Sequence, residues 1–169
     1  DKASTGVFHP GFIDKLWHRS RDNTKAGSQD NIAEHYDLGN EFYKLWLDDT
    51  MSYSSAIFDS TTNSLEAAQR LKLKRVMQAA EVAPDKDILE IGCGWGGFAE
   101  EAGKSGASVR GITLSAEQLK FAQDRIARLN LNERCTFHFE DYRDTRGVFD
   151  SIASVEMIEA VGEAHWPTY

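Results

Sequence analysis

The clearest hydrophobic pattern in the chain is a short apolar run that ends in glycines. Ile88, Leu89 and Ile91 predict a buried strand, and glycines recur in the segment 92–97 that follows it. Residues 98–101 then begin a helical pattern. A strand, a glycine loop and a helix in this order form the unit by which α/β proteins bind nucleotides, because glycine lets a ligand lie against bare main chain. The sequence therefore predicts a nucleotide-binding loop at this point.

The pattern after this loop alternates between strands and helices. It predicts strands at 107–112, 135–139 and 149–155, and a helix at 115–129. Strands separated by helices pair in parallel with right-handed crossovers. We therefore expect a Rossmann-like, doubly wound parallel α/β sheet with ligands at the carboxyl ends of its strands. Four strands are too few for a complete fold of this kind, so we expect the C-terminal strands to be missing and the chain to be a fragment.

The pattern before the glycine loop is helical and aromatic. A helical region at 31–47 is dense in aromatic side chains, and the segment 51–58 has the composition of a loop. Asn63 precedes a helix of roughly eighteen residues, with Glu66 three positions on in a capping-box-like arrangement. Residues 1–30 are polar around one small apolar patch and are expected to form a linker segment.

Composition and charge narrow the class of function. The 169 residues are 41% hydrophobic and 27% charged, which is typical of a soluble globular domain. The net charge of −8 argues against a general nucleic-acid partner. The sequence shows neither a signal-peptide pattern nor an apolar run long enough to span a bilayer. Because Cys93 and Cys135 lie in unrelated settings and no Cys/His cluster has ligand spacing, we expect a cytoplasmic protein that binds no metal.

The glycines alone do not identify the nucleotide. Gly92, Gly94 and Gly97 fit the dinucleotide pattern, whereas the first two with Gly96 fit the looser pattern of methyltransferases, and a plain tight turn would use glycines as well. Dinucleotide-binding folds place a carboxylate near the end of the second strand to hold the ribose hydroxyls. This chain has Thr113 and no carboxylate there, which disfavours an NAD-dependent oxidoreductase.

Polar residues follow the second and third predicted strands. Ser115 and Gln118 have the spacing of a capping box, so Gln118 is either a helix cap or a ligand to a ribose. Asp141 beside Tyr142 suits an adenine, since a carboxylate accepts from the amino group while the ring stacks. The same pair is also compatible with a solvated, charged turn.

Two carboxylates follow the fourth predicted strand. Glu156 and Glu159 lie beside apolar residues, and acids in such places are paired or functional more often than not. Their spacing of three places them on one face of a starting helix. The helix dipole also favours acids there, so one of the two has a purely structural interpretation.

Five motifs in a fixed order carry a more specific signal. They are His35-Tyr36-Asp37-Leu38-Gly39-Asn40, Tyr53-Ser54-Ser55-Ala56, Leu89-Glu90-Ile91-Gly92-Cys93-Gly94-Trp95-Gly96, Thr113-Leu114-Ser115-x-x-Gln118 and Glu156-Met157-Ile158-Glu159. Together they resemble the cyclopropane-fatty-acid synthase family, whose members are class I methyltransferases that depend on S-adenosylmethionine (SAM). The resemblance runs from Asn31 to Tyr169.

The resemblance implies a cofactor-binding role for several matched residues. Tyr53 and Ser54 would contact SAM from the N-terminal side. Gly92 and Gly94 would let the methionine part of SAM approach the backbone, with Glu90 supporting that loop.

The resemblance also implies roles around the nucleoside and the reacting carbon. Gln118 would reach the ribose, and Asp141 and Tyr142 would hold the adenine. Glu159 matches an acid that helps to hold a bicarbonate ion, and Tyr36 matches an aromatic residue of the active site. The family's further bicarbonate ligands, a His and a Tyr, would come from sequence beyond this chain.

The implied activity is methyl or methylene transfer to the cis double bond of an unsaturated fatty acyl chain. The partner would be a phospholipid at a membrane surface, and the product a cyclopropane or methyl-branched fatty acid. One departure from the family pattern is Ser55, where cyclopropane synthases carry Cys.

Two alternatives remain. One is a small-molecule N-methyltransferase of the coclaurine type, and the other is a SAM-binding or lipid-docking module without catalysis. The implied organisation is a linker at 1–30, a helical cap over the cofactor site at 31–83 and a SAM-binding core at 84–169.

Overall fold

The computed structural model describes residues 39–169. The predictions for the segment 1–30, for Tyr36 and for the first part of the helical region 31–47 lie outside the described residues. Within that region, helix α3 (Gly39–Tyr43) is followed by turns up to Trp46. The segment 51–58 contains neither helix nor strand, as predicted.

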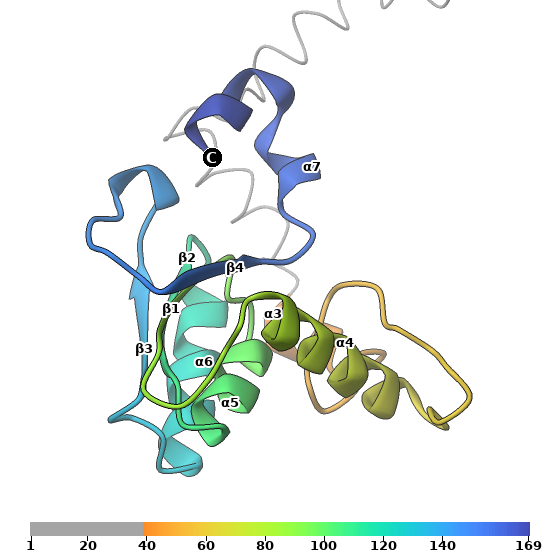
Figure 1. The fold of residues 1–169 in the computed structure, drawn as a ribbon. Coiled ribbons are helices and arrows are strands. Elements are labelled where there is room, and N and C mark those ends of the chain that lie inside the picture. Colours follow the sequence, from red (N-terminus) through yellow and green to blue (C-terminus); the bar gives the residue numbers. More distant parts are fainter. Residues whose placement is uncertain (1–38) are drawn as a thin grey trace, which may run out of the picture.

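Four parallel strands form a single sheet (Figure 1). Their order is β3-β2-β1-β4, and each neighbouring pair runs parallel. This arrangement confirms the predicted Rossmann-like sheet, whose strand order changes direction between β1 and β4. The strands are β1 (Asp87–Ile91), β2 (Ser108–Thr113), β3 (Cys135–Phe139) and β4 (Ser151–Ser154).

Two helices cover one face of this sheet, α5 (Gly97–Lys104) and α6 (Ala116–Arg128) (Figure 1). Successive right-handed crossovers that step in one direction across a sheet leave their helices on the same face. The main apolar core lies between them and the sheet and includes Ile88, Val109 and Ile126, all almost completely buried.

The other face is covered by the connection from β3 to β4. That connection contains a short 3-10 helix, η1 (Tyr142–Asp144), where the predicted alternation calls for an α-helix. A smaller cluster forms on this face, in which Leu89, Ile91 and Ile112 pack against Phe149 and other partly buried side chains.

Helix α4 (Leu65–Ala79) precedes the sheet and contacts α5. Its N-cap is Ser64, whose Oγ accepts a hydrogen bond from the Ala67 amide, so the capping box predicted from Asn63 is wrong. Glu66 pairs instead with Arg70 one helical turn away, at 2.9 Å.

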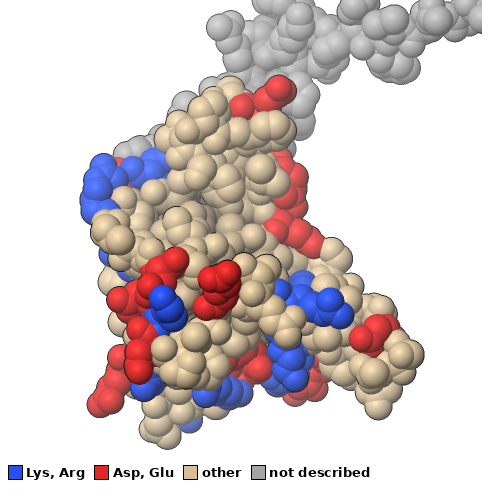
Figure 2. Space-filling view, viewed as in Figure 1, with Lys and Arg blue, Asp and Glu red and all other residues tan. Residues whose placement is uncertain are grey.

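The last elements are α7 (Ile158–Val161) and the 3-10 helix η2 (Glu163–Thr168). Acidic and basic side chains are interspersed around the sheet on the face shown in Figure 2, and the area above them is largely uncharged. Glu156 lies before α7 in a left-handed conformation, so the prediction that it shares a helical face with Glu159 is wrong. Among residues 39–169, no helix has the length and apolar character that crossing a membrane requires.

Candidate functional site

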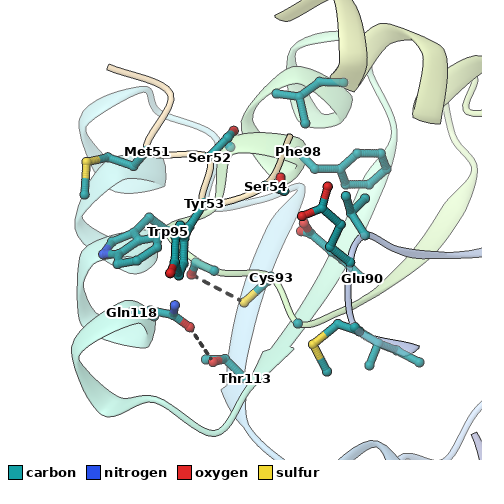
Figure 3. A pocket seen from close by; sticks show the side chains of 18 of the residues that line it. Met51, Ser52, Tyr53, Ser54, Glu90, Cys93, Trp95, Phe98, Thr113 and Gln118 are labelled. Atoms are coloured by element: carbon teal, nitrogen blue, oxygen red, sulfur yellow. Dashed lines mark hydrogen bonds between the residues drawn. The ribbon is translucent and has the colours of Figure 1, made fainter. Parts of the chain in front are cut away.

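A cavity of about 900 Å³ lies at the carboxyl ends of the four strands and includes the point where the strand order changes direction. Doubly wound sheets bind ligands there, because the loops that leave the strands diverge. Trp95 and Gln118 lie on one side of this cavity, and Glu90 and Phe98 lie on the other (Figure 3). Nine of the ten predicted site residues line it, and the tenth, Tyr36, is outside the described residues. Those nine are Tyr53, Ser54, Glu90, Gly92, Gly94, Gln118, Asp141, Tyr142 and Glu159.

The glycine loop forms one wall of the cavity. Gly92, Gly94 and Gly96 have φ values of 75°, 51° and 81°, in the left-handed region that favours glycine. A Cβ added at Gly94 would meet no atom within 4 Å, so this backbone faces open space. Gly96 is the N-cap of α5, and its position leaves the first amides of that helix near the loop. The loop therefore offers bare main chain to a ligand.

Glu90, the last residue but one of β1, carries a buried carboxyl group that forms no ion pair with any residue between 39 and 169. It is 8% exposed, and its Oε2 has no hydrogen-bond partner among the described residues. Burial alone raises the pKa of Glu90 well above its ordinary value. The resemblance implies that Glu90 supports the glycine loop. If it does, no hydrogen bond to Oε2 from the described residues takes part in that support. The arrangement suits a ligand that brings positive charge.

The Gln118 side chain forms a hydrogen bond other than the one that a capping box requires. Ser115 Oγ accepts from the Gln118 backbone amide at 3.3 Å, but the Gln118 side chain does not return to the Ser115 amide as a capping box requires. Its Oε1 accepts instead from Thr113 Oγ1 at 3.0 Å, and Thr113 Oγ1 also accepts from the Ser115 amide at 3.1 Å. With this amide orientation, Gln118 Nε2 is left as a donor at the cavity (Figure 3).

Asp141 and Tyr142 line the cavity but have neighbours of their own. The Asp141 carboxylate accepts from Arg143 Nε at 2.7 Å and from Nη2 at 2.5 Å. The Tyr142 ring stacks edge to face with Tyr169, with centroids 5.1 Å apart. Asp141 caps η1 in a charged turn and also lines the cavity, and its role toward an adenine stays a prediction.

Helix α4 holds the Tyr53–Ser54 segment in place. Gln69 Nε2 donates to the carbonyl of Ser54 at 2.7 Å, and the Lys72 ammonium donates to Ser54 Oγ. Gln69 and Lys72 are both buried, and burial lowers the pKa of Lys72. Sequence analysis missed both residues. Their signal is visible afterwards, since they share the face of α4 that carries the buried Leu73.

Ser55 is tied to the end of β4. Its amide donates to Glu156 Oε1 at 2.8 Å, and its hydroxyl donates to the same oxygen. These hydrogen bonds lower the pKa of Glu156. Glu159 stands in the first turn of α7 as an exposed side chain at the cavity.

Two further residues join the N-terminal part to the glycine loop. Trp95 Nε1 donates to Asn40 Oδ1 at 2.6 Å, so residues from two of the matched motifs meet in space. Arg125 on α6 donates to the carbonyls of Thr50 and Trp95, at 2.9 and 3.1 Å. Sequence analysis missed Arg125 because its partners are distant backbone atoms, which leave no local pattern.

The two thiols contribute no reactive group to the site. Cys93 lines the cavity but is buried, and burial raises the pKa of its thiol well above the ordinary value. Burial likewise raises the pKa of Cys135 to about 11. Within the part of the chain that the structure describes, no group of three or more His, Cys, Asp and Glu side chains is placed to hold a metal ion.

Known proteins resemble this chain in sequence and in fold. Tuberculostearic acid methyltransferase UfaA1 of Mycobacterium tuberculosis is 41% identical over 172 residues, which cover 98% of this chain and 38% of that protein. Cyclopropane-fatty-acyl-phospholipid synthase of Escherichia coli is 44% identical over 137 residues, covering 80% of this chain and 35% of that protein. The solved structure of mycolic acid cyclopropane synthase CmaA1, complexed with SAH and CTAB, matches 81% of this chain and 48% of its own at a TM-score of 0.76 and 29% identity.

The chain spans less than two fifths of the length of these two curated relatives. The family model described as mycolic acid cyclopropane synthetase matches residues 23–169, which is most of the chain. This match confirms the resemblance that the five motifs indicate, and the chain belongs to the mycolic acid cyclopropane synthetase family.

Proposed function

We propose that the protein transfers the methyl group of SAM to the cis double bond of an unsaturated fatty acyl chain in a phospholipid. Transfer leaves a cation on the chain; loss of a proton from the new methyl group closes a cyclopropane, and loss of a proton from the chain instead leaves a methyl-branched, unsaturated fatty acid. The observation that carries this proposal is the buried, unpaired Glu90 carboxyl group in a cavity walled by the glycine loop. Membership of the family supports the fatty acyl acceptor.

The cavity fits the chemistry of SAM. SAM carries an ammonium and a sulfonium group, and a buried carboxyl group without a partner gains most from a cationic ligand. Glu90 meets that requirement, and the open space beside Gly94 lets the methionine part approach the main chain. The Gln118 Nε2 donor would reach the ribose, Asp141 and Tyr142 would hold the adenine, and the Tyr53–Ser54 segment would contact SAM from the N-terminal side.

When bound, SAM supplies an electrophilic methyl group that needs no activation by the protein. The chain's own residues then have two tasks, which are to align the acceptor and to keep water from the site. Leu47, Met51, Phe58 and Leu65 give the cavity an apolar side, which suits a hydrocarbon chain. Glu159 remains our candidate for orienting a bicarbonate ion, and Tyr36 for the aromatic face beside the reacting carbon.

The phospholipid is the finer part of the proposal. The relatives include a cyclopropane-fatty-acyl-phospholipid synthase, a tuberculostearic acid methyltransferase and a cyclopropane mycolic acid synthase. All are named for fatty acids or their derivatives, and they differ in the carrier of the chain and in the product. Action on a phospholipid would bring the protein to a membrane surface, at least peripherally.

The test is label transfer with the protein in its full natural length. Methyl-labelled SAM is incubated with vesicles of unsaturated phospholipid, and in parallel with saturated phospholipid of the same head group. We expect label in the acyl chains of the unsaturated lipid only. Absence of label from both lipids would contradict the proposal, and label in a small amine would favour an N-methyltransferase.

A further inference from the structure

Glu156 has an unusual backbone at the edge of the cavity. Its φ of 51° lies in the left-handed region, which residues other than glycine and asparagine adopt at a cost in free energy. Such outliers gather at functional sites, where the surrounding structure holds them in place. Glu156 also lines the cavity, so its conformation points to a role there.

Ser55 fixes the Glu156 side chain. Both donors of Ser55, the amide and the hydroxyl, bind Glu156 Oε1. Oε2 accepts no hydrogen bond from any residue between 39 and 169. One oxygen is therefore anchored across 101 positions of sequence, at an exposed residue that lines the cavity.

Glu156 also sits against the glycine loop through its neighbour. A Cβ added at Gly92 would lie 2.6 Å from Met157 Sδ, so the Met157 side chain packs directly on the bare Gly92 backbone. The turn at 156–157 thus touches two segments that we propose to contact SAM, the glycine loop on one side and the 53–55 loop on the other.

Glu156 adds a negative charge to the cavity, and no ion pair joins it to a Lys or Arg side chain among residues 39–169. Two other carboxylates at the cavity are paired with arginines, Glu140 with Arg110 at 2.6 Å and Asp141 with Arg143 at 2.5 Å. The Lys72 ammonium donates to Ser54 Oγ, and its positive charge also acts on the Glu156 carboxylate. Hydrogen bonds from Ser55 lower the pKa of Glu156, which keeps it ionised at neutral pH.

We propose that Glu156 makes the site favour the cationic methyl donor over its neutral product. This inference rests on the proposed function. Transfer forms a bond between the methyl carbon and an alkene carbon, using the π electrons of the acceptor, and breaks the bond between the methyl carbon and sulfur. The electron pair of that bond stays on sulfur, and the sulfonium becomes a neutral thioether, S-adenosylhomocysteine (SAH). A fixed carboxylate attracts the donor and loses that attraction after transfer. Glu156 therefore favours binding of fresh SAM and release of SAH.

The experiment measures the dissociation constants of SAM and SAH by calorimetry, for the protein in its full natural length and its variants. Glu156→Gln keeps an oxygen that accepts from Ser55 and removes the charge. We expect the ratio Kd(SAH)/Kd(SAM) to fall roughly tenfold in this variant. Lys72→Met removes a nearby cation, and the ratio should rise.

Two controls make the result specific. Glu133→Gln changes the net charge equally at an exposed position away from the cavity and should leave the ratio unchanged. Glu156→Asp keeps the carboxylate and should stay closer to the wild-type ratio than Glu156→Gln. An unchanged ratio in Glu156→Gln, or an equal fall in Glu133→Gln or Glu156→Asp, would overturn the inference while the proposed function stands. Failure of the wild-type protein to bind either compound would contradict the proposed function and, with it, the inference.

Discussion

At the scale of single residues, the Glu90 carboxyl group is buried at a cost to the free energy of unfolding. It is buried and its Oε2 has no partner among the described residues. Isolated charges are costly to bury, and proteins respond by keeping such groups protonated. A residue that opposes stability in this way is typical of a binding site, where a ligand provides the missing interaction.

Glu90→Gln should separate stability from binding. Burial raises the pKa of Glu90, so the folded state holds this proton at pH values where the unfolded state has lost it. The free energy of unfolding therefore falls as the pH rises from the ordinary value of 4.5 through the raised pKa. We expect Glu90→Gln to be more stable than the wild type at neutral pH, measured by urea denaturation without ligand.

The same variant should bind SAM more weakly. A cation favours the ionised carboxylate, so SAM binding to the wild type should release a proton from Glu90, and calorimetry in buffers of different ionisation enthalpy measures that release. In Glu90→Gln the release should disappear. A variant less stable than the wild type and equal in SAM affinity would show that Glu90 supports the fold only.

Glu156 is a second residue that lowers the stability of the fold, because its backbone is in the left-handed region that is unfavourable for a residue with a Cβ. Glu156→Gly and Glu156→Ala both lose the hydrogen bonds to Ser55. They differ in the cost of a Cβ at a φ of 51°. We expect the glycine variant to be more stable than the alanine variant by about 1 kcal/mol in denaturant unfolding. Equal stabilities would mean that this turn relaxes out of the left-handed region.

At the scale of elements, Arg125 joins α6 to segments far away in sequence. It is 7% exposed and donates to the carbonyls of Asp49, Thr50 and Trp95. Those carbonyls belong to the segment before the Tyr53–Ser54 loop and to the glycine loop. A single guanidinium thus holds two walls of the cavity at a fixed separation, with a planar set of donors that lysine lacks.

Arg125→Met should destabilise the protein by about 3 kcal/mol, because buried carbonyls lose their donors. The measurement is the free energy of unfolding from urea titration. Arg128→Met, on the same helix but exposed, is the matched control and should stay within about 0.5 kcal/mol of the wild type. If Arg125→Met were as mild as the control, the link between the two walls would carry little of the stability.

Elements that depend on local pattern could be predicted from the sequence. The strand Cys135–Phe139 has the predicted bounds. The helix expected at 115–129 occupies Ala116–Arg128, and residues 115 and 129 are its N-cap and C-cap. Each is specified by its own apolar period and its own end signals. The cap of α4 was misassigned by one residue, since Asn63 and Ser64 are both good N-caps and only packing chooses between them.

At the scale of the whole molecule, the sheet brings together residues that the sequence holds apart. The glycine loop could be predicted, because a strand followed by glycines and a helix is typical of a nucleotide-binding loop in α/β proteins. The link between Ser55 and Glu156 spans 101 positions, and the contact of Arg125 with Thr50 spans 75. Such pairs leave no periodic trace, so sequence reasoning could name the cavity-lining residues but not the groups that hold them.

Under the proposed function, one cavity holds both a cofactor and an acyl chain. The four strands end at the same edge, and α4 with the 51–58 loop closes an apolar side over it. Gln118 and the bare glycine loop offer polar groups to a cofactor, and Leu47, Phe58 and Leu65 from the N-terminal part offer apolar surface to an acyl chain. This division matches a polar, cationic donor placed against a hydrocarbon acceptor.

The most direct test of methyl transfer to a lipid acyl chain uses SAM with a fully deuterated methyl group and an unsaturated phospholipid. The lipids are analysed by mass spectrometry after reaction with the protein in its full natural length. We predict deuterium in the acyl chain, with two atoms retained in a cyclopropane or three in a methyl branch. Acyl chains without deuterium, from a protein shown by calorimetry to bind SAM, would contradict the account.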